Sequence, residues 1–364
     1  MGALALVGRA GFSGNGGSPG MRRCTLPPAF WCRWCPSSIF WAWGACSGWL
    51  VGCASPRGRS RGLAYLFLLL GLAGWLGWDS RGALHHLGQD PFLLDRERNA
   101  PAEKLFAWLE GGIAPDTDIL WGPSDSLPNW RYEGCFDFRE FPSDVHTWEE
   151  LGAYAQARGA RYAIVDGQTV ARREELLSPF FDIQGDGVAV RAIPPNWALT
   201  YAQPGLPCRW CVFQLLDQQP IAQPLSLTLG GQIRFLGYDV AHTAVQPGGH
   251  LQFTLYWQLL APVSEDYTVF THLLSPGNVL LAQVDRQPLQ GRVPTSQWLP
   301  GGIYADRFDI LLPLDIPPGE AQLEVGLYQW TTMERLPVVT AEGQQLPEDR
   351  VLLPTPIIIQ VAKP

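Results

Sequence analysis

The chain has 364 residues, of which 46% are hydrophobic and 16% are charged, and its formal net charge is -8. This balance is typical of a folded protein and excludes an intrinsically disordered one. The acidic surplus argues against nucleic acid as the main partner, because no basic stripe is present to neutralise phosphates. The 39 glycines and 32 prolines follow no Gly-x-y period, which excludes collagen and favours a turn-rich body of strands.

The charge is divided unequally along the chain. Residues 1–78 contain seven arginines and no acidic residue, which leaves 19 basic and 34 acidic residues in 79–364. A basic N-terminal segment is therefore followed by an acidic remainder of the chain, and the two parts are expected to face different surroundings.

An apolar run, LAYLFLLLGLAGWLGW, ends the basic part and predicts a transmembrane helix at 62–78. Three arginines in the segment before it place residues 79–364 outside the cytoplasm, beyond the cell membrane, by the positive-inside rule. The alternative is the apolar stretch of a secretory signal. That alternative would need small residues where Trp75 and Trp78 stand.

Residues 1–61 are expected to be an atypical or disordered N-terminus. A charge-free stretch at 38–54 is a candidate for a first membrane span. Five of the eight cysteines fall in the first 53 residues, together with several tryptophans. This composition is also typical of GC-rich DNA translated in the wrong frame.

A small α/β domain is predicted at 95–200, because helix and strand patterns alternate there. Helices are expected at 102–109, from a capping box at Thr147 and Glu150 to Gly159, and at 172–177. Strands are expected at 118–121, 161–166 and 187–193.

An antiparallel β-sandwich of the immunoglobulin-like kind is predicted at 225–364. In 250–259, apolar residues alternate with polar ones, which indicates a strand with one buried face. The other predicted strands are 233–240, 267–274, 279–284, 303–312, a strand around 321–328, and 351–361. Seven or eight short strands separated by Pro-Gly and Gly-Gly turns are typical of a sandwich.

The sandwich residues also carry a resemblance to a known family. The runs GQIRFLGYDV, VQPGGHLQFTLYWQ, DYTVFTHLL, PTSQWLPGGIYADRFDILLP and PPGEAQLEVGLY are similar to a C-terminal β-sandwich of bacterial polytopic glycosyltransferases. Those enzymes resemble protein O-mannosyltransferases and arabinosyltransferase-like proteins. The resemblance covers about residues 62–361 and implies the C-terminal part of such an enzyme, beginning at its last membrane helix.

The chain departs from that family in its catalytic part. Family members have eight or more spanning helices and an acidic pair in the first extracytoplasmic loop, whereas no acidic residue precedes Asp79 here. No catalytic residue is therefore carried over, and the chain is not expected to be an enzyme on its own. The resemblance implies a membrane-anchored extracytoplasmic accessory module of a lipid-linked-sugar glycosyltransferase. The alternative is an independent membrane-anchored carbohydrate-binding or adhesion protein. Expected partners are membrane lipid, a polytopic glycosyltransferase core or a glycan.

Two CxxC pairs occur, at Cys32–Cys35 and Cys208–Cys211. They lie on opposite sides of the expected membrane helix and so do not share a zinc ion. The second pair is interpreted as a local disulfide or as two buried thiols. No histidine spacing matches a metal site, so no metal and no cofactor are predicted.

Aromatic side chains supply the remaining candidate site. Tyr256, Trp298, Tyr328 and Trp330 are expected on the outer surface of the sandwich, where flat rings can stack against sugars. The alternative is that they pack against the α/β segment or the membrane-proximal surface.

Overall fold

The computed structural model describes residues 96–114, 117–121 and 136–361. They belong to one compact unit, Leu84–Pro364. The membrane spans expected at 62–78 and 38–54, and Cys32 and Cys35, lie outside the described ranges. Within those ranges, no helix is both long and apolar enough to cross a membrane.

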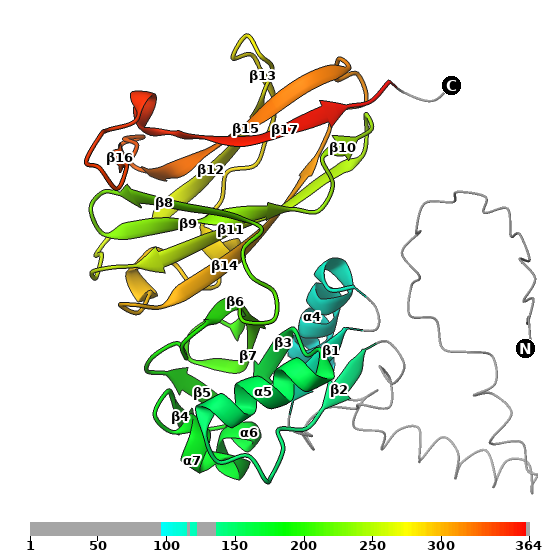
Figure 1. The fold of residues 1–364 in the computed structure, drawn as a ribbon, viewed down its shortest axis with the longest axis vertical. Helices are drawn as coiled ribbons and strands as arrows, with labels where there is room; N and C mark the ends of the chain where they lie inside the picture. Colours follow the sequence, from blue (N-terminus) through cyan, green and yellow to red (C-terminus); the bar gives the residue numbers. More distant parts are fainter. Residues whose placement is uncertain (1–95, 115–116, 122–135, 362–364) are drawn as a thin grey trace, which may run out of the picture. The chain divides into compact units, whose positions relative to one another are not determined.

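The described residues form mostly strands, with few helices (Figure 1). The elements up to residue 215 are α4 (Arg96–Gly112), β1 (Asp118–Trp121), β2 (Asp137–Arg139), α5 (Trp148–Arg158), β3 (Tyr162–Val165), α6 (Gly167–Arg172), α7 (Glu174–Leu177), β4 (Phe181–Gln184), β5 (Gly187–Val190), β6 (Trp197–Pro204) and β7 (Cys208–Leu215). The strands that follow are β8 (Gln223–Leu229), β9 (Ile233–Val240), β10 (Ala244–Val245), β11 (His250–Leu259), β12 (Tyr267–Leu274), β13 (Leu280–Gln283), β14 (Ile303–Leu311), β15 (Gly319–Gln329), β16 (Val338–Val339) and β17 (Val351–Ile359). Three 3-10 turns complete the described part, at Pro288–Gly291, Thr295–Gln297 and Pro347–Asp349.

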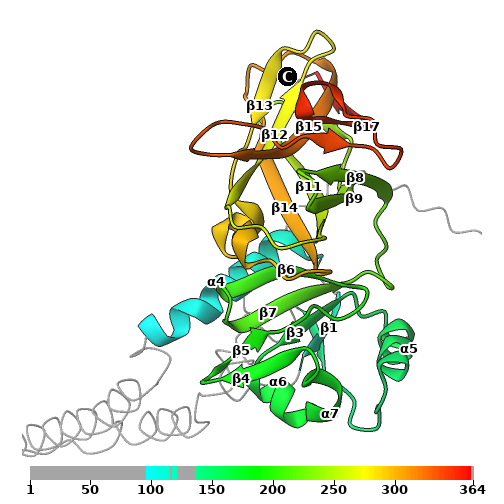
Figure 2. The ribbon, with the colours of Figure 1, turned by 90° about the vertical axis from the view of Figure 1, so that its left-hand side faces the viewer.

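The strands make two sheets. The first has the order β16-β8-β9-β11-β14-β6-β7-β3-β1-β2, with β4 and β5 attached beside β7, and the second has the order β10-β17-β15-β12-β13. The first sheet runs from the sandwich into the α/β layer without interruption, because β14 pairs in parallel with β6 through Ile303↔Ala198 and Tyr304↔Leu199. Figure 2 shows this sheet from the side, with α5, α6 and α7 around its lower part.

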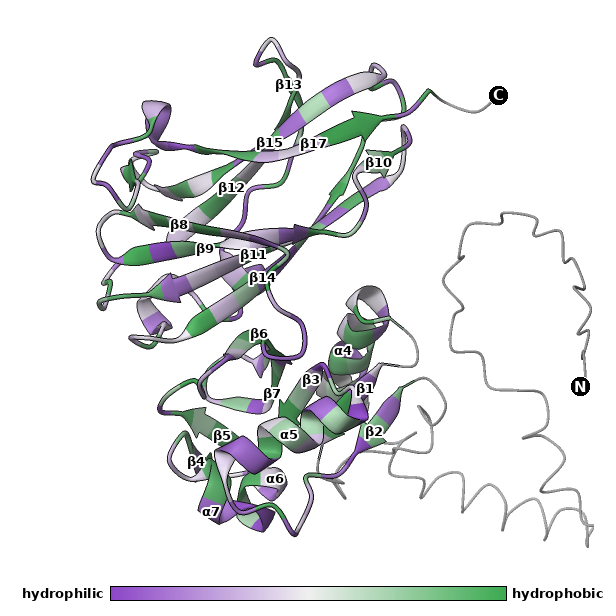
Figure 3. Ribbon diagram, viewed as in Figure 1, coloured by the Kyte–Doolittle hydropathy of each residue, from purple (hydrophilic) through white to green (hydrophobic). Residues whose placement is uncertain are grey.

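The interior of the sandwich follows the predicted alternation. Leu251, Phe253, Leu255 and Trp257 of β11 are buried in one cluster with residues of β15 such as Leu323. The sandwich strands in Figure 3 change between hydrophobic and hydrophilic colour along their length, as expected when one face is buried. The prediction of a β-rich, sandwich-like fold is confirmed.

The start and the end predicted for helix α5 in the α/β layer are also confirmed. Thr147 caps α5, its side chain accepting the Glu150 N–H while the Glu150 carboxylate accepts the Thr147 N–H, and Gly159 ends the helix at φ 67°. The single helix expected at 172–177 is wrong. Two short helices, α6 and α7, meet at Arg173, whose φ of -128° and ψ of 42° are not helical. The Asp166 side chain caps α6 and starts that helix earlier than the sequence pattern indicated.

Replacing Trp257 by alanine should lower the free energy of unfolding of the full chain by about 3–5 kcal/mol, because a large buried side chain leaves a cavity. The Trp257 side chain is fully buried, with its ring centroid 4.7 Å from that of Phe235. Trp330→Ala is the matched control, since Trp330 is 66% exposed. The control should change the stability by less than about 0.5 kcal/mol in urea unfolding. Equal losses in the two variants would contradict this assignment of the buried face.

Candidate functional site

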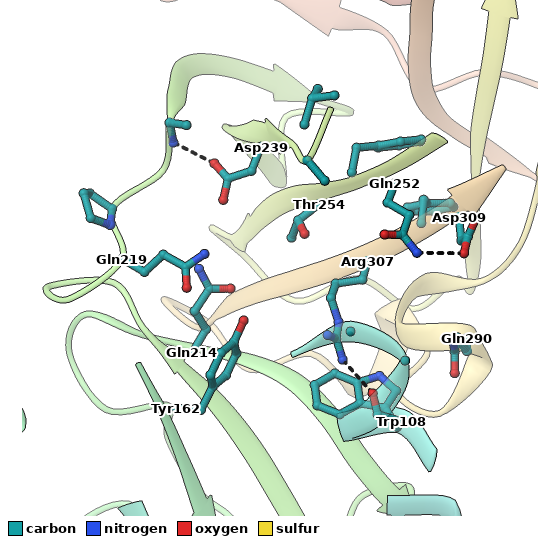
Figure 4. A pocket seen from close by; sticks show the side chains of 18 of the residues that line it. Trp108, Tyr162, Gln214, Gln219, Asp239, Gln252, Thr254, Gln290, Arg307 and Asp309 are labelled. Atoms are coloured by element: carbon teal, nitrogen blue, oxygen red, sulfur yellow. Dashed lines mark hydrogen bonds between the residues drawn. The ribbon is translucent and has the colours of Figure 1, made fainter. Parts of the chain in front are cut away.

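A cavity of about 590 Å³ lies between α4 and the outer face of β9, β11 and β14 (Figure 4). Its size falls within the range of about 300–1,000 Å³ that is usual for small-molecule sites. The strands contribute polar side chains: Asp239, Gln252, Thr254, Arg307 and Asp309. The other walls carry Trp108 of α4, Tyr162 of β3, Gln214 of β7 and Gln219. The lining is thus rich in amide, hydroxyl and charged groups.

The strand alternation places these polar groups. Gln252 and Thr254 lie between the buried residues of β11, so their side chains leave the opposite face of the sheet. Arg307 pairs with Thr254 across the β11–β14 ladder, and Asp309 pairs with Gln252. The same pattern that fills the sandwich interior therefore builds one wall of the cavity.

Arg307 is held against helix α4. Its Cζ lies 3.5 Å from the centroid of the Trp108 ring, and its Nη2 donates a hydrogen bond of 3.4 Å to the Trp108 carbonyl oxygen. Its Nη1 makes no hydrogen bond. Burial lowers the pKa of Arg307 to about 10, so the guanidinium stays charged at neutral pH.

Tyr256 connects the α/β layer to the sandwich beside this cavity. It accepts a 2.8 Å hydrogen bond from Gln214 Nε2 and donates a 2.6 Å hydrogen bond to Asp239 Oδ2. Burial, followed by the hydrogen bond to Asp239 and its negative charge, raises the pKa of Tyr256. The phenol is therefore neutral and acts as a fixed donor to Asp239.

The two carboxylates of the cavity are already engaged. Asp239 also accepts the Ala222 N–H at 2.6 Å. Asp309 accepts from Gln252 Nε2 at 3.0 Å, and its Oδ1 lies 2.7 Å from His250 Nδ1. Across the described ranges, no group of three or more His, Cys, Asp or Glu side chains is placed to hold a metal ion. The arrangement suits the binding of a polar molecule.

The structure does not bring the four predicted stacking residues together on an open surface. Tyr256, Trp298 and Tyr328 are buried, and their expected outward exposure is wrong. Gln214 covers Tyr256, and Trp298 stacks on Tyr304 at 4.3 Å. Tyr328 is covered because the segment after β15 folds back, with an isolated bridge between Tyr328 and Arg335. The alternative of packing against the α/β segment describes Tyr256, whereas Trp298 and Tyr328 are covered by other sandwich residues and Trp330 is exposed.

Cys208 and Cys211 are joined in a disulfide. Both side chains are buried in β7 rather than at the start of a helix, where a low thiol pKa would support redox chemistry. The disulfide is therefore interpreted as a structural link within the strand.

A second cluster of charges lies on the sandwich, around Glu324 of β15. Arg335 Nη1 and Arg350 Nη1 each approach its carboxylate to 3.0 Å, and His272 Nδ1 lies 3.8 Å from it. His272 Nε2 lies 3.4 Å from Asp285. Burial opposes the charge on His272, but hydrogen bonds to Asp285 and Glu324 outweigh it and raise its pKa to about 9. The charges compensate one another, as in a structural network.

The sequence alone did not identify the residues of the cavity. The clearest sign of such a residue in the sequence was Trp108. It is a large aromatic residue that lies outside the apolar face of the predicted helix at 102–109. Arg307 looked like an ordinary polar residue of the strand predicted at 303–312, and no strand was predicted around Gln214. Their importance comes from contacts with segments distant in the sequence.

No family model and no curated protein matches the chain. Among solved structures, the C-terminal domain of wzt is 13% identical over 39% of this chain and 83% of that one, with a TM-score of 0.24. A Bacteroides uniformis beta-glucuronidase is 11% identical over 44% of this chain and 18% of that one, with a TM-score of 0.21. The CARDB domain of the PF1109 protein from Pyrococcus furiosus is 8% identical over 38% and 92%, with a TM-score of 0.21. These similarities are too low to assign a family.

The His272 cluster predicts a loss of stability at alkaline pH. The folded pKa of about 9 lies above the ordinary 6.5, so the stabilisation from charged His272 is complete below pH 6.5 and is lost as the pH rises through 9. We expect the unfolding free energy in urea to fall by about 1–3 kcal/mol more for the wild type than for His272→Gln between pH 6 and 10. Parallel losses in the two proteins would show that His272 is not stabilised in its charged form.

Proposed function

We propose that residues 96–361 form a non-catalytic module that binds a saccharide in the cavity between α4 and the β9–β11–β14 face. The observation that carries the proposal is the lining of the cavity, in which amide, hydroxyl and charged side chains converge from separate elements. Sugars present many hydroxyl groups, which such side chains bind as donors and acceptors. None of the four aromatic residues predicted to stack against sugars lines this cavity.

More specifically, we propose that this module is an accessory part of a lipid-linked-sugar glycosyltransferase. It is anchored in the membrane, lies outside the cytoplasm and contains an immunoglobulin-like sandwich. The resemblance of the sandwich runs supports it, as does the change from a basic to an acidic sequence. The Cys208–Cys211 disulfide also supports an extracytoplasmic location, since such bonds persist in oxidising compartments. Sugar transfer needs a carboxylate base positioned on the acceptor, and the chain by itself is proposed to have no such activity.

A second candidate is an independent membrane-anchored carbohydrate-binding or adhesion protein. The same cavity supports it, because binding requires no second chain there. The two candidates differ in partner. A polytopic glycosyltransferase that co-purifies with the full chain, and stimulation of its sugar transfer by the chain, would favour the accessory module.

Filling the cavity should abolish saccharide binding. Gly111 lines the cavity on α4, and a Cβ added there meets nothing within 4 Å, so Gly111→Leu adds bulk without a clash. The full chain would be tested on an array of mannose- and arabinose-containing oligosaccharides and then titrated with the best binder by calorimetry. We expect at least a tenfold loss of affinity, about 1.4 kcal/mol, with no fall in the melting temperature.

Gly152→Leu is the matched control, because Gly152 lies in helix α5, outside this cavity, and is equally free of close neighbours. Its affinity should equal that of the wild type. A wild-type chain that binds no saccharide, or equal affinities for the two leucine variants, would refute the proposed site.

The proposed location can be tested with a reporter enzyme that is active only outside the cytoplasm. Fused after residue 364, the reporter should be active, because the arginines before the expected helix at 62–78 favour the cytoplasmic side. The same reporter fused after Arg61 should be silent. A silent C-terminal fusion in an expressed protein would overturn the proposed topology.

A further inference from the structure

Two neighbouring residues of β14 differ in how their charges are compensated. Asp306 faces the sandwich interior, where it accepts hydrogen bonds from Arg286 Nη2 at 2.9 Å and from the Leu289 N–H at 3.0 Å. Arg307 points to the opposite face and forms no ion pair with any residue in the described ranges. The cavity thus contains a guanidinium group whose charge no carboxylate neutralises directly.

The contacts that hold Arg307 leave part of its hydrogen-bonding capacity unused. Trp108 contributes a cation–π contact and one long hydrogen bond, and Nη1 is buried with no partner. A cation–π contact stabilises a guanidinium only modestly, whereas a buried charge without a hydrogen-bonded counter-ion is costly. An anion bound beside the guanidinium in the cavity would offset this cost.

Gly112 makes room for the guanidinium. A Cβ at this position would overlap Arg307 Nη1, so a larger residue would displace the group. The end of α4 therefore positions Arg307 in two ways: the ring of Trp108 contacts the guanidinium, and the missing side chain of Gly112 leaves the space that the guanidinium fills.

Two carboxylates, Asp239 and Asp309, also line the cavity, and both hydrogen-bond to groups other than Arg307. Asp239 is bound by Tyr256 and the Ala222 N–H, and Asp309 by Gln252 and His250. Burial raises the pKa values of both Tyr162 and Tyr256, so these phenols are neutral.

We infer that the saccharide bound in this cavity carries an oxyanion, a carboxylate or a phosphate, which Arg307 binds. The planar guanidinium matches either group, since it can donate two parallel hydrogen bonds. The inference rests on the proposed function and names the chemical class of its ligand. Thr254, Gln219 and Gln290 line the same cavity and can meet the hydroxyl groups of the sugar ring.

The test compares three probes that share one sugar ring: glucose, glucuronate and glucose 6-phosphate. Each would be titrated calorimetrically into the full chain, into Arg307→Gln and into the control Arg234→Gln. Arg234 is a partly buried arginine of β9, in the same sheet, and it does not line the cavity. A carboxylate-specific or a phosphate-specific site is then distinguished by which of the two anionic probes binds.

We expect at least one anionic probe to bind about tenfold or more tighter than glucose to the wild type and to Arg234→Gln. Arg307→Gln should reduce this preference to less than about twofold, without lowering the melting temperature. Gly112→Ala, which displaces the guanidinium but keeps its charge, should also reduce the preference and serves if Arg307→Gln fails to fold.

The outcomes separate this inference from the proposed function. Equal affinity for glucose and both anionic probes in the wild type would overturn the inference and leave saccharide binding in place. Failure to bind any of the sugars, combined with thermal stabilisation by inorganic phosphate that Arg307→Gln loses, would support the anion site and refute saccharide binding at it. Absence of both effects would overturn both.

Discussion

The rest of the described structure depends on the contact between the sandwich and the α/β layer, here called the seam. At this seam β14 pairs in parallel with β6, and Ala198, Tyr256 and Ala305 form a small buried cluster. Tyr256 adds hydrogen bonds in both directions, from Gln214 and to Asp239. A single sheet therefore continues through both layers, and their elements hold fixed positions around the cavity.

The cavity follows from this constraint. The outer face of an antiparallel sandwich sheet is usually exposed to water and carries polar residues for that reason. Here α4 and the end of β7 stand opposite that face, so Thr254 and Arg307 line a cavity. Trp108 then approaches Arg307 closely enough for a cation–π contact. Polar side chains that would be plain surface on an isolated sandwich thus lie in the wall of a cavity.

Local sequence signals predicted the elements that depend on neighbours along the chain. The alternation in β11 predicted its limits and all of its buried residues except Tyr256, and the Thr147 capping box placed the start of α5 correctly. Strands β6 and β7 were missed, although both are almost wholly buried. A strand buried on both faces shows no alternation, so the period-two pattern that identified the other strands is absent here.

The candidate site was harder to predict because its residues meet across long distances in the sequence. Tyr256 occupies an outward position in the alternation of β11, and only its contact with Gln214 of β7 explains its burial. Arg307 likewise depends on Trp108, about 200 positions earlier. Period-two patterning assigns a face to each side chain, but it cannot say what covers that face.

The coupling between Gln214 and Tyr256 tests the central claim most directly, because it measures the contact across the seam. Urea unfolding of the wild type, Gln214→Ala, Tyr256→Phe and the double variant gives this coupling as a double-mutant cycle. The account predicts a coupling energy of about 1 kcal/mol or more, with all four proteins unfolding in one transition. Additive losses to within about 0.3 kcal/mol, or separate transitions for the two layers, would contradict it.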